Sequence, residues 1–382
     1  MTKLKIDKTN WKLTKFGDVV YEPKETVKDV VTENIQHVVG LEHIDTDDIH
    51  LRRSASIQES TTFTKKFAKG DVLFGRRRAY LRKAAQAEFE GICSGDITVF
   101  RAKPALSVRL LPFVVNNDAF FDYAITHSAG GLSPRVRFRD LANYEFLLPP
   151  PEEQEKLVEL LWAMDEVIES QELTLEKLNS YYASLVDDLF TSENKSWQYK
   201  TLSQVANINV KALKANTNDN YEFQYLDIAS IIEPKVIGKL TSYMFSEAPS
   251  RARRVVSNNS IVLSLVRPYL KAFVYVTNAE NLIASTGTAV VDVKNGYNTR
   301  FIFHQFFSKR FSTFCENLMT GTNYPAITAN DLKMFKICIP HKIDTQNKYA
   351  DKLDSIENSI FLCKESIITS KALQKSLINQ IF

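Results

Sequence analysis

A proline run and a long uninterrupted segment follow one another in LPPPEEQEKLVELLWAMDEVIESQELTLEKLNSYYASLVDDLF, residues 148–190. Proline cannot continue a β-ladder but is well tolerated in the first turn of a helix, so Pro149 to Pro151 end a strand and begin a helix. From Glu152 to Phe190 there is no glycine or proline, and apolar residues recur at alternating spacings of four and three. This heptad pattern predicts a coiled-coil helix about 58 Å long at 1.5 Å per residue.

A second segment of this kind follows Pro340 and ends the sequence. Its seam is weaker because Ser370 and Gln374 fall on it, whereas the first seam has one polar member, Gln171. Two seams of matched length can satisfy each other within one chain, so we expect them to pair antiparallel. The alternatives are dimerisation of two chains and ordinary bundle packing. The predicted seam consists of Leu157, Leu161, Met164, Ile168, Leu175, Leu178, Tyr182, Leu185, Leu189, Leu353, Ile356, Ile360, Ile367, Leu377 and Ile381.

The rest of the sequence is also repeated. Matching stretches occur in the same order at separations of 186 to 192 residues, which a chance resemblance would not produce five times. They pair Trp11–Val19 with Trp197–Val205, Asp71–Arg82 with Ser260–Lys271, Ile97–Phe100 with Thr288–Val291, Pro134–Pro149 with Pro325–Pro340, and Ser184–Phe190 with Ser376–Phe382. The sequence therefore indicates an internal duplication.

Each copy has a globular part, here called a head, followed by a long helix. The predicted segments are head 1 (1–151), the first helix (152–190), head 2 (191–340) and the second helix (341–382). Alternating apolar patterns predict strands at 71–76, 96–102, 144–148, 261–266, 288–293 and 335–339, with one helix in each head at about 110–127 and 299–319. The expected fold class is α+β: two tandem mixed α/β domains, each followed by a long helix, the helices forming an antiparallel coiled coil with pseudo-two-fold symmetry.

The net charge of +3 hides a strong division along the chain. The four segments carry net charges of +4, −9, +7 and +1 in order. Basic heads favour a polyanionic partner, and an acidic helix favours protein contacts.

Basic residues gather in corresponding parts of the heads. Head 1 has no acid between Asp71 and Glu88, and its later arginines alternate with Val136 and Phe138, so that in a strand they would share one face. Arginine binds phosphate and guanine bidentately and asparagine can read adenine, which suits duplex DNA. Any single arginine could instead be solvated or paired within the chain. The candidate DNA-binding residues are Arg76, Arg77, Arg78, Tyr80, Arg82, Lys83, Arg135, Arg137, Arg139, Arg251, Arg253, Arg254, Arg267, Tyr269, Lys271, Asn323 and Tyr324.

Catalytic and metal-binding patterns are missing from the sequence. It has no G-x-x-x-x-G-K-[ST] or G-x-G-x-x-G loop, no amino-methyltransferase motif and no metal-ligand spacing among its six histidines. The four cysteines, Cys93, Cys315, Cys338 and Cys363, are widely spaced and are expected to be reduced. No apolar run suits a signal peptide or a membrane span, so we expect a cytoplasmic protein with no membrane partner. Because the catalytic and metal-binding motifs are missing, we expect no catalytic or metal site in this chain.

The sequence resembles the specificity subunits of type I restriction–modification systems over nearly its whole length. Gly70–Gly75, leading to Arg78–Leu81, looks like the family's mid-domain strand and turn. Gly131–Pro134, through Asp140-Leu141 to Leu148–Gln154, looks like its exit into the helix. The second copy is less complete there, with Asn330–Leu332, Ile339-Pro340 and Gln346.

The resemblance implies a non-catalytic reader of double-stranded DNA. Each target-recognition domain would read one half of a bipartite sequence, while the helices fix the gap and dock two methyltransferase (modification) subunits. Restriction/translocase subunits would complete the complex, and S-adenosylmethionine, ATP and magnesium would bind to the partners rather than to this chain. A hypothesis of another class is a dumbbell-shaped protein-binding scaffold without DNA sequence specificity.

Overall fold

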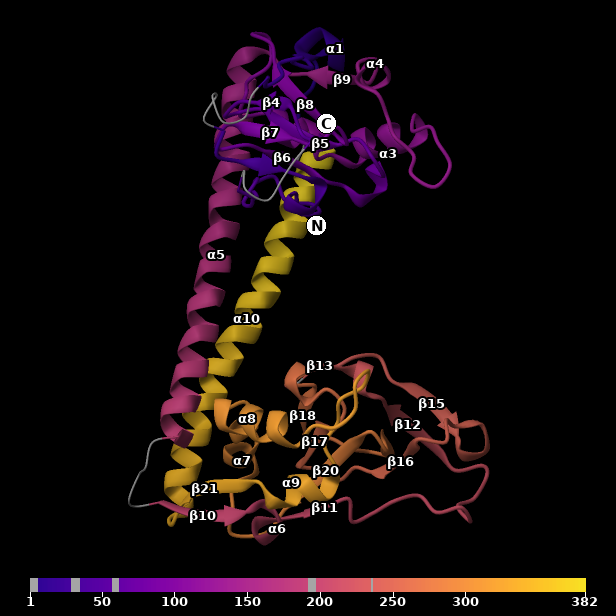
Figure 1. Cartoon of the computed structure of the whole chain (residues 1–382), viewed down its shortest axis with the longest axis vertical. Helices are drawn as coiled ribbons and strands as arrows, with labels where there is room; N and C mark the ends of the chain where they lie inside the picture. The colour runs from indigo at the N-terminus through magenta and orange to yellow at the C-terminus, as the bar shows by residue number, and fades with distance from the viewer. Residues whose placement is uncertain (1–5, 29–34, 57–61, 192–196, 235) are drawn as a thin grey trace. The chain divides into compact units, whose positions relative to one another are not determined.

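The computed structural model describes residues 6–28, 35–56, 62–191, 197–234 and 236–382 (Figure 1). The chain divides into two compact units. Unit 1 contains Met1–Glu172 together with Glu365–Phe382, and unit 2 contains Leu173–Lys364. Each unit therefore combines one head with a part of both long helices.

Head 1 is built on a four-stranded antiparallel sheet with the order β2-β8-β5-β6. A smaller sheet, β3-β7-β4, contains one parallel pair, and β1 pairs with β9 at the entrance to the long helix. The strands are β1 (Lys12–Lys15), β2 (Val20–Tyr21), β3 (Val38–Val39), β4 (Lys65–Phe67), β5 (Val72–Gly75), β6 (Ala84–Gln86), β7 (Gly91–Cys93), β8 (Ile97–Ala102) and β9 (Glu145–Leu148).

Head 2 repeats this plan. Its sheet β11-β20-β17-β18 corresponds to the four-stranded sheet of head 1, and β10 pairs with β21 as β1 does with β9. A second four-stranded sheet, β15-β12-β19-β16, again contains one parallel pair, and β13 pairs with β14. The strands are β10 (Trp197–Thr201), β11 (Ala206–Ile208), β12 (Glu222–Leu226), β13 (Ile231–Glu233), β14 (Val236–Ile237), β15 (Thr241–Met244), β16 (Ala252–Val255), β17 (Ser260–Ser264), β18 (Phe273–Val276), β19 (Leu282–Ser285), β20 (Thr288–Val293) and β21 (Lys336–Pro340).

Two long helices follow the heads, as the heptad pattern predicted. They are α5 (Pro151–Thr191) and α10 (Ile343–Ile381). The short helices are α1 (Phe16–Val19), α2 (Leu111–Val115), α3 (Asp118–Thr126), α4 (Phe138–Leu141), α6 (Leu202–Val205), α7 (Thr299–Gln305), α8 (Lys309–Leu318) and α9 (Ala329–Met334). Two tandem mixed α/β domains, each followed by a long helix, are thus confirmed. The four-segment division of the chain stays a prediction, because the compact units interleave the helices.

The single helix expected in each head was wrong, since two short helices stand there. Asn117 ends the first part, and its side-chain oxygen accepts a hydrogen bond from the backbone N–H of Phe120, 2.7 Å away. Ser308 caps α8 in the same way, accepting from the N–H of Phe311 at 3.3 Å. An N-cap residue leaves the helical conformation to make this bond, so the apolar periodicity continues while the helix does not.

The core of unit 1 joins head 1 to both long helices. Buried phenylalanines from α1, β5, β8 and α3 pack with Val158 and Leu161 of α5 and with Leu377, Ile378 and Ile381 of α10. Figure 1 shows the C-terminal end of α10 entering this head. In unit 2, Val186 and Phe190 of α5 pack with Phe301, Ala350 and Leu353. Each head therefore buries the end of the helix that belongs to the other copy.

The long helices are antiparallel within each unit. In unit 1, Asp165 of α5 meets Gln374 of α10, and Gln171 donates to Ser366 at 2.9 Å, so the contacts run in opposite directions along the two helices. All fifteen predicted seam residues are buried or partly buried. The polar seam positions Gln171 and Gln374 are accommodated by these side-chain hydrogen bonds. Within the described residues, no helix is both long and apolar enough to cross a membrane.

Candidate nucleic-acid interface

A strained turn carries the first basic cluster of each head. In head 1, Arg78 and Arg82 flank the 3-10 turn η3 (Ala79–Leu81) with φ values of 54° and 52°. In head 2, Arg267 and Lys271 flank η6 (Pro268–Leu270) with φ values of 48° and 53°. Left-handed backbone is unfavourable for residues other than glycine and concentrates at functional sites. Its presence at four equivalent basic positions marks this turn, here called the αL turn, as a candidate site.

Each αL turn is held against a loop from later in the same head. In head 1 the N–H of Arg78 donates to the carbonyl of Pro134 at 2.8 Å, and in head 2 the N–H of Arg267 donates to the carbonyl of Pro325 at 2.7 Å. The two loops, Gly130–Pro134 and Gly321–Pro325, are here called the finger loops. The structure thereby brings together segments that are more than fifty residues apart.

Part of the predicted basic cluster of head 1 forms ion pairs within the head. Arg77 and Arg135 both bind Asp96, at 3.1 and 2.8 Å. Burial opposes ionisation of Asp96, but the hydrogen bonds from the two arginines outweigh it, so its pKa lies below the usual value. These pairs hold the finger loop to the turn, because Arg77 also donates to the hydroxyl of Ser133 at 3.1 Å.

Arg82 and Lys83 have clear structural partners. Arg82 binds Asp47 at 2.9 Å and Asp118 at 2.5 Å, and its guanidinium lies 4.6 Å from the ring centre of Phe121. Lys83 donates to the carbonyl of Leu41 at 2.7 Å. The side chains of Arg82 and Lys83 are therefore held against other parts of head 1 rather than left in open solvent. Arg76 is half-buried, whereas Arg78 and Tyr80 are exposed.

Residues 135–139 do not form the strand that would place Arg135, Arg137 and Arg139 on one face. Arg135 makes an isolated bridge with Ala129, Arg137 is the N-cap of α4, and Arg139 lies inside that helix. Val136 is fully buried and the ring of Phe138 packs 6.0 Å from that of Phe100, so the chain turns to bury both. The three arginines are all exposed, but they do not share a strand face.

The candidate residues of head 2 form two neighbouring groups. Arg267 donates to the carbonyl of Asn323 at 3.0 Å and lies 4.8 Å from the ring centre of Tyr324, so αL turn and finger loop meet as in head 1. Tyr269 and Lys271 are exposed on the same turn.

The second group of head 2 lies at β16. It contains Arg251, exposed just before the strand, and the half-buried Arg253 and Arg254 within it. Arg253 stacks 4.9 Å from the ring centre of Phe245. The backbone of Arg251 bonds to Thr286, and Gly287 bonds to Leu265 near the turn, which brings this group close to the first. DNA contact by any of these candidates stays a prediction.

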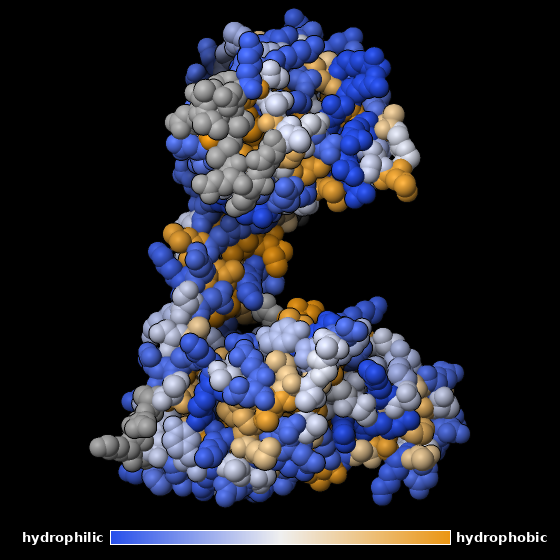
Figure 2. Space-filling model, viewed as in Figure 1, coloured by the Kyte–Doolittle hydropathy of each residue, from blue (hydrophilic) through white to orange (hydrophobic). Residues whose placement is uncertain are grey.

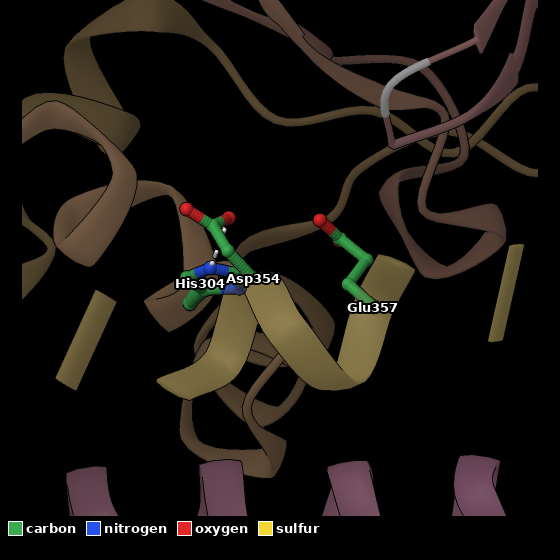
Figure 3. A group of neighbouring side chains, drawn as sticks. All are labelled: His304, Asp354 and Glu357. Atoms are coloured by element: carbon green, nitrogen blue, oxygen red, sulfur yellow. Dashed lines mark hydrogen bonds and ion pairs between the residues drawn. The ribbon is translucent and has the colours of Figure 1, made fainter. Parts of the chain in front are cut away.

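Local sequence patterns do not reveal the histidine–carboxylate contacts that join the heads to the long helices. In unit 2, His304 is fully buried and lies near Asp354 and Glu357 of α10, with possible ligand atoms within 4.8 Å of one another (Figure 3). Tyr182 of α5 bonds to Nδ1 of His304 at 2.8 Å, and Asp354 bonds to Nε2 at 3.1 Å. Both ring nitrogens thus have protein partners, and Asp354 is also paired with Arg300 at 2.5 Å. This arrangement fits a structural junction better than a metal centre.

A similar junction stands in unit 1. Nε2 of His50 lies 2.7 Å from the buried carboxylate of Asp165, which also accepts a bond from Gln374 at 3.4 Å. The hydrogen bond to Asp165 raises the pKa of His50 and burial opposes the rise. None of the four cysteines, all of which the structure describes, forms a disulfide, and burial raises the pKa of Cys93 and Cys315 to about 12, which leaves these two thiols unreactive.

The model of the type I restriction modification DNA specificity domain matches residues 9–180 and again residues 194–369. The chain belongs to this family. Its two copies of the specificity domain cover the two heads and most of both long helices.

Curated relatives of the family match parts of the chain. The MjaVIII specificity subunit of a type I restriction enzyme from Methanocaldococcus jannaschii is 23% identical over 269 residues, which is 64% of this chain and 63% of that protein. The EcoDI specificity subunit from Escherichia coli is 27% identical over 142 residues, 36% of this chain and 32% of that protein. The matches thus span less than two thirds of these relatives.

Solved structures support the fold over the whole length. The S subunit of a type I restriction-modification system from M. genitalium is 14% identical with a TM-score of 0.61, covering 100% of this chain and 98% of that one. A chain from a study of complex assembly and conformational transition in a type I R-M system is 20% identical with a TM-score of 0.59, covering 97% and 96%. At such identities the likeness concerns the fold.

Proposed function

We propose that this chain is the non-catalytic DNA-reading subunit of a type I restriction–modification complex, in which each head reads one half of a bipartite target. The observation that carries the proposal is the double match to the specificity domain, one for each head. Both heads also place a basic αL turn against a finger loop. Two similar readers in one chain suit a target with two unlike halves, since the turn and loop residues differ between the heads.

DNA binding would divide between positioning and reading. Exposed arginines such as Arg78, Arg137 and Arg251 are free to meet phosphates, which gives affinity and salt dependence without sequence information. Tyr80 is exposed on the turn that follows Arg78, and Tyr269 and Asn323 are exposed beside Arg267, so these three residues are candidates for base contacts. The paired residues Arg77 and Arg82 would act by holding the turn in shape.

The long helices would set the gap between the two half-sites. Both α5 and α10 begin against one head and end in the core of the other unit, without an internal proline or glycine. A continuous helix adds about 1.5 Å per residue, so its length fixes a spacing more firmly than a flexible linker does. Insertion of residues into both helices should change the preferred gap and leave each half-sequence unchanged.

The surfaces of the helices suit protein partners. Leu160, Val167, Leu173, Leu362 and Ile368 are exposed on α5 and α10 outside the seam, and Figure 2 shows hydrophobic surface on these helices. Exposed apolar side chains gathered on helices mark protein interaction sites. We assign them to two methyltransferase subunits, which would bring S-adenosylmethionine. Restriction/translocase subunits, with ATP and magnesium, would complete the assembly.

Selection from a pool of random duplexes tests the proposal. The tagged full chain is purified from its own cells with its bound partners, and the retained DNA is sequenced. A reader enriches a motif of two defined parts with a constant gap. A protein-binding scaffold enriches none, and methylation or cleavage of DNA by the chain without partners would also contradict the proposal.

A further inference from the structure

The two finger loops share one construction. In head 1 the backbone groups of Ala129 and Arg135 exchange two hydrogen bonds of 2.9 Å around Gly130–Pro134. In head 2 Thr320 and Ala326 exchange two of 3.0 Å around Gly321–Pro325. The first glycine of each loop has positive φ, 115° at Gly130 and 96° at Gly321. Both loops are therefore five-residue turns of the same type.

Each finger loop exposes a large apolar side chain near its tip. Leu132 is 97% exposed and Tyr324 is 71% exposed, which are the highest values for large hydrophobic residues among those that the structure describes. They occupy the third position of the first loop and the fourth position of the second. Figure 1 shows the loop between α3 and α4 projecting from head 1, and Figure 2 shows hydrophobic surface at this projection.

In each head, an arginine at or directly before the αL turn contacts the tip of the finger loop. Arg77 bonds to Ser133 beside Leu132, and Arg267 bonds to Asn323 and stacks on Tyr324. Backbone hydrogen bonds fix both ends of each loop, and the guanidinium group fixes the residues near its tip, so the tip is held in place while it stays exposed. An apolar side chain fixed in this position beside exposed arginines faces whatever those arginines bind.

We propose that Leu132 and Tyr324 are the DNA-deforming tips of the two heads, each inserting between neighbouring bases of its half-site. The inference rests on the proposed function and adds a means of recognition to it. Apolar wedges unstack base steps, and the energy of doing so depends on the sequence, so they contribute specificity where no hydrogen bond is made. Leucine is a typical wedge, and tyrosine can also stack on a base.

The test uses the tagged full chain with its bound partners and duplexes carrying the selected two-part motif. Leu132→Ala should lower affinity for the motif about tenfold, the value of burying a leucine side chain, and Tyr324→Ala should do so at least as strongly. The slope of affinity against salt should stay unchanged, because no phosphate contact is lost. Leu13→Ala is the matched control, since Leu13 is 62% exposed in head 1 but lies on β1.

A second readout locates the contact. 2-Aminopurine is placed at single positions of each half-site outside the methylated base, where its fluorescence reports unstacking. The rise seen with the original chain should vanish in the first half with Leu132→Ala and in the second half with Tyr324→Ala, and Leu132→Met should restore it. Unchanged affinity and fluorescence in both alanine variants would overturn the proposal. It would also be overturned if an alanine variant lost its bound partner subunits and its affinity for both half-sites fell equally. If the original chain selects no motif, the proposed function itself fails.

Discussion

The side-chain amide of Asn379 donates a hydrogen bond to the carboxylate of Asp118 at 2.6 Å, and its carbonyl accepts one from the N–H of Asp118 at 2.8 Å. Asn379 lies near the end of α10, and Asp118 begins α3 of head 1. In unit 2 Asp187, near the end of α5, accepts from the N–H of Lys309 at 2.6 Å, the first residue of α8. Each head thus has a helix capped by the long helix of the other copy.

Each of these helix caps should stabilise one unit and leave the other unchanged. Asn379→Ala leaves the first N–H of α3 without its acceptor and should destabilise unit 1 by about 1 kcal/mol, the usual value of a helix cap. Asp187→Ala should do the same to unit 2. Amide hydrogen exchange of α3 and α8 in the full chain measures both effects. Equal changes in both helices from either variant would contradict the pairing.

Removal of the apolar end of α10 should have a larger effect. Ile381 is fully buried in the core of unit 1, so Ile381→Ala should cost about 2 to 5 kcal/mol. Leu373→Ala, at an exposed position of the same helix, should be nearly neutral. Urea unfolding, monitored by amide hydrogen exchange in head 1, measures the loss of stability in each variant. Similar losses for Ile381→Ala and Leu373→Ala would mean that the end of α10 is not part of that core.

The stability of unit 1 should depend on the protonation of His50. Its pKa is raised, so the pair with Asp165 stabilises the fold fully below the ordinary histidine pKa of about 6.5 and loses this contribution as the pH rises through the folded value. The difference in unfolding free energy between the original chain and His50→Gln should therefore be largest in mildly acidic solution. His127→Gln, at an exposed ring, is the control. A difference that grows with pH would contradict the pairing.

Arg78 and Arg82 lie close together in the sequence, but we expect Arg78 to contribute to DNA binding and Arg82 to stability. The side chain of Arg78 is exposed and makes no hydrogen bond or ion pair with the described residues, so Arg78→Ala should lower the salt slope of DNA binding by about one without changing the melting temperature. Arg82→Ala should lower the melting temperature by several degrees, because Asp47, Asp118 and Phe121 each lose one of their contacts. Thermal unfolding and binding at several salt concentrations test both. A lower melting temperature for Arg78→Ala alone would reverse the assignment.

Two equivalent glutamines should fix each long helix to its head. Gln154 accepts from the N–H of Ser107 at 2.8 Å and donates to the carbonyls of Ala105 and Pro149, and Gln346 accepts from the N–H of Asn298 at 2.9 Å and donates to the carbonyl of Pro340. Gln154→Leu should cost about 1 to 3 kcal/mol, because it strands these backbone groups in a buried site. It should also widen the range of gaps accepted in duplex selection. A destabilised variant with an unchanged gap would limit Gln154 to a structural role.

Much of the architecture could be predicted from local patterns. The heptads of α5 and the prolines around it act within the segment itself, so the helix ends agree within a residue or two. The helix break at Asn117 depends on one side-chain cap, and the turn of the chain at Arg135–Arg139 depends on the packing of Val136 and Phe138 against the core. Periodicity alone does not reveal either of these.

The candidate site was harder to predict because its partners are distant in sequence. Arg77 and Arg135 meet at Asp96, and Arg82 meets Asp47 and Asp118, so a run of basic residues divides into paired and exposed members only after folding. The exchange of helix ends likewise depends on contacts across more than 250 residues, as between Asp118 and Asn379. The duplication indicated matched parts without indicating that they cap one another.

Mapping methylated bases across the genome, with and without this gene, tests whether this chain directs methylation to a two-part target. One two-part motif should lose its methylation when the gene is removed and regain it when the gene is restored. A chain carrying a head 2 from another family member should change one half of that motif and keep the other half and the gap. A methylation pattern that does not depend on the gene, or a head exchange that alters both halves, would contradict this prediction.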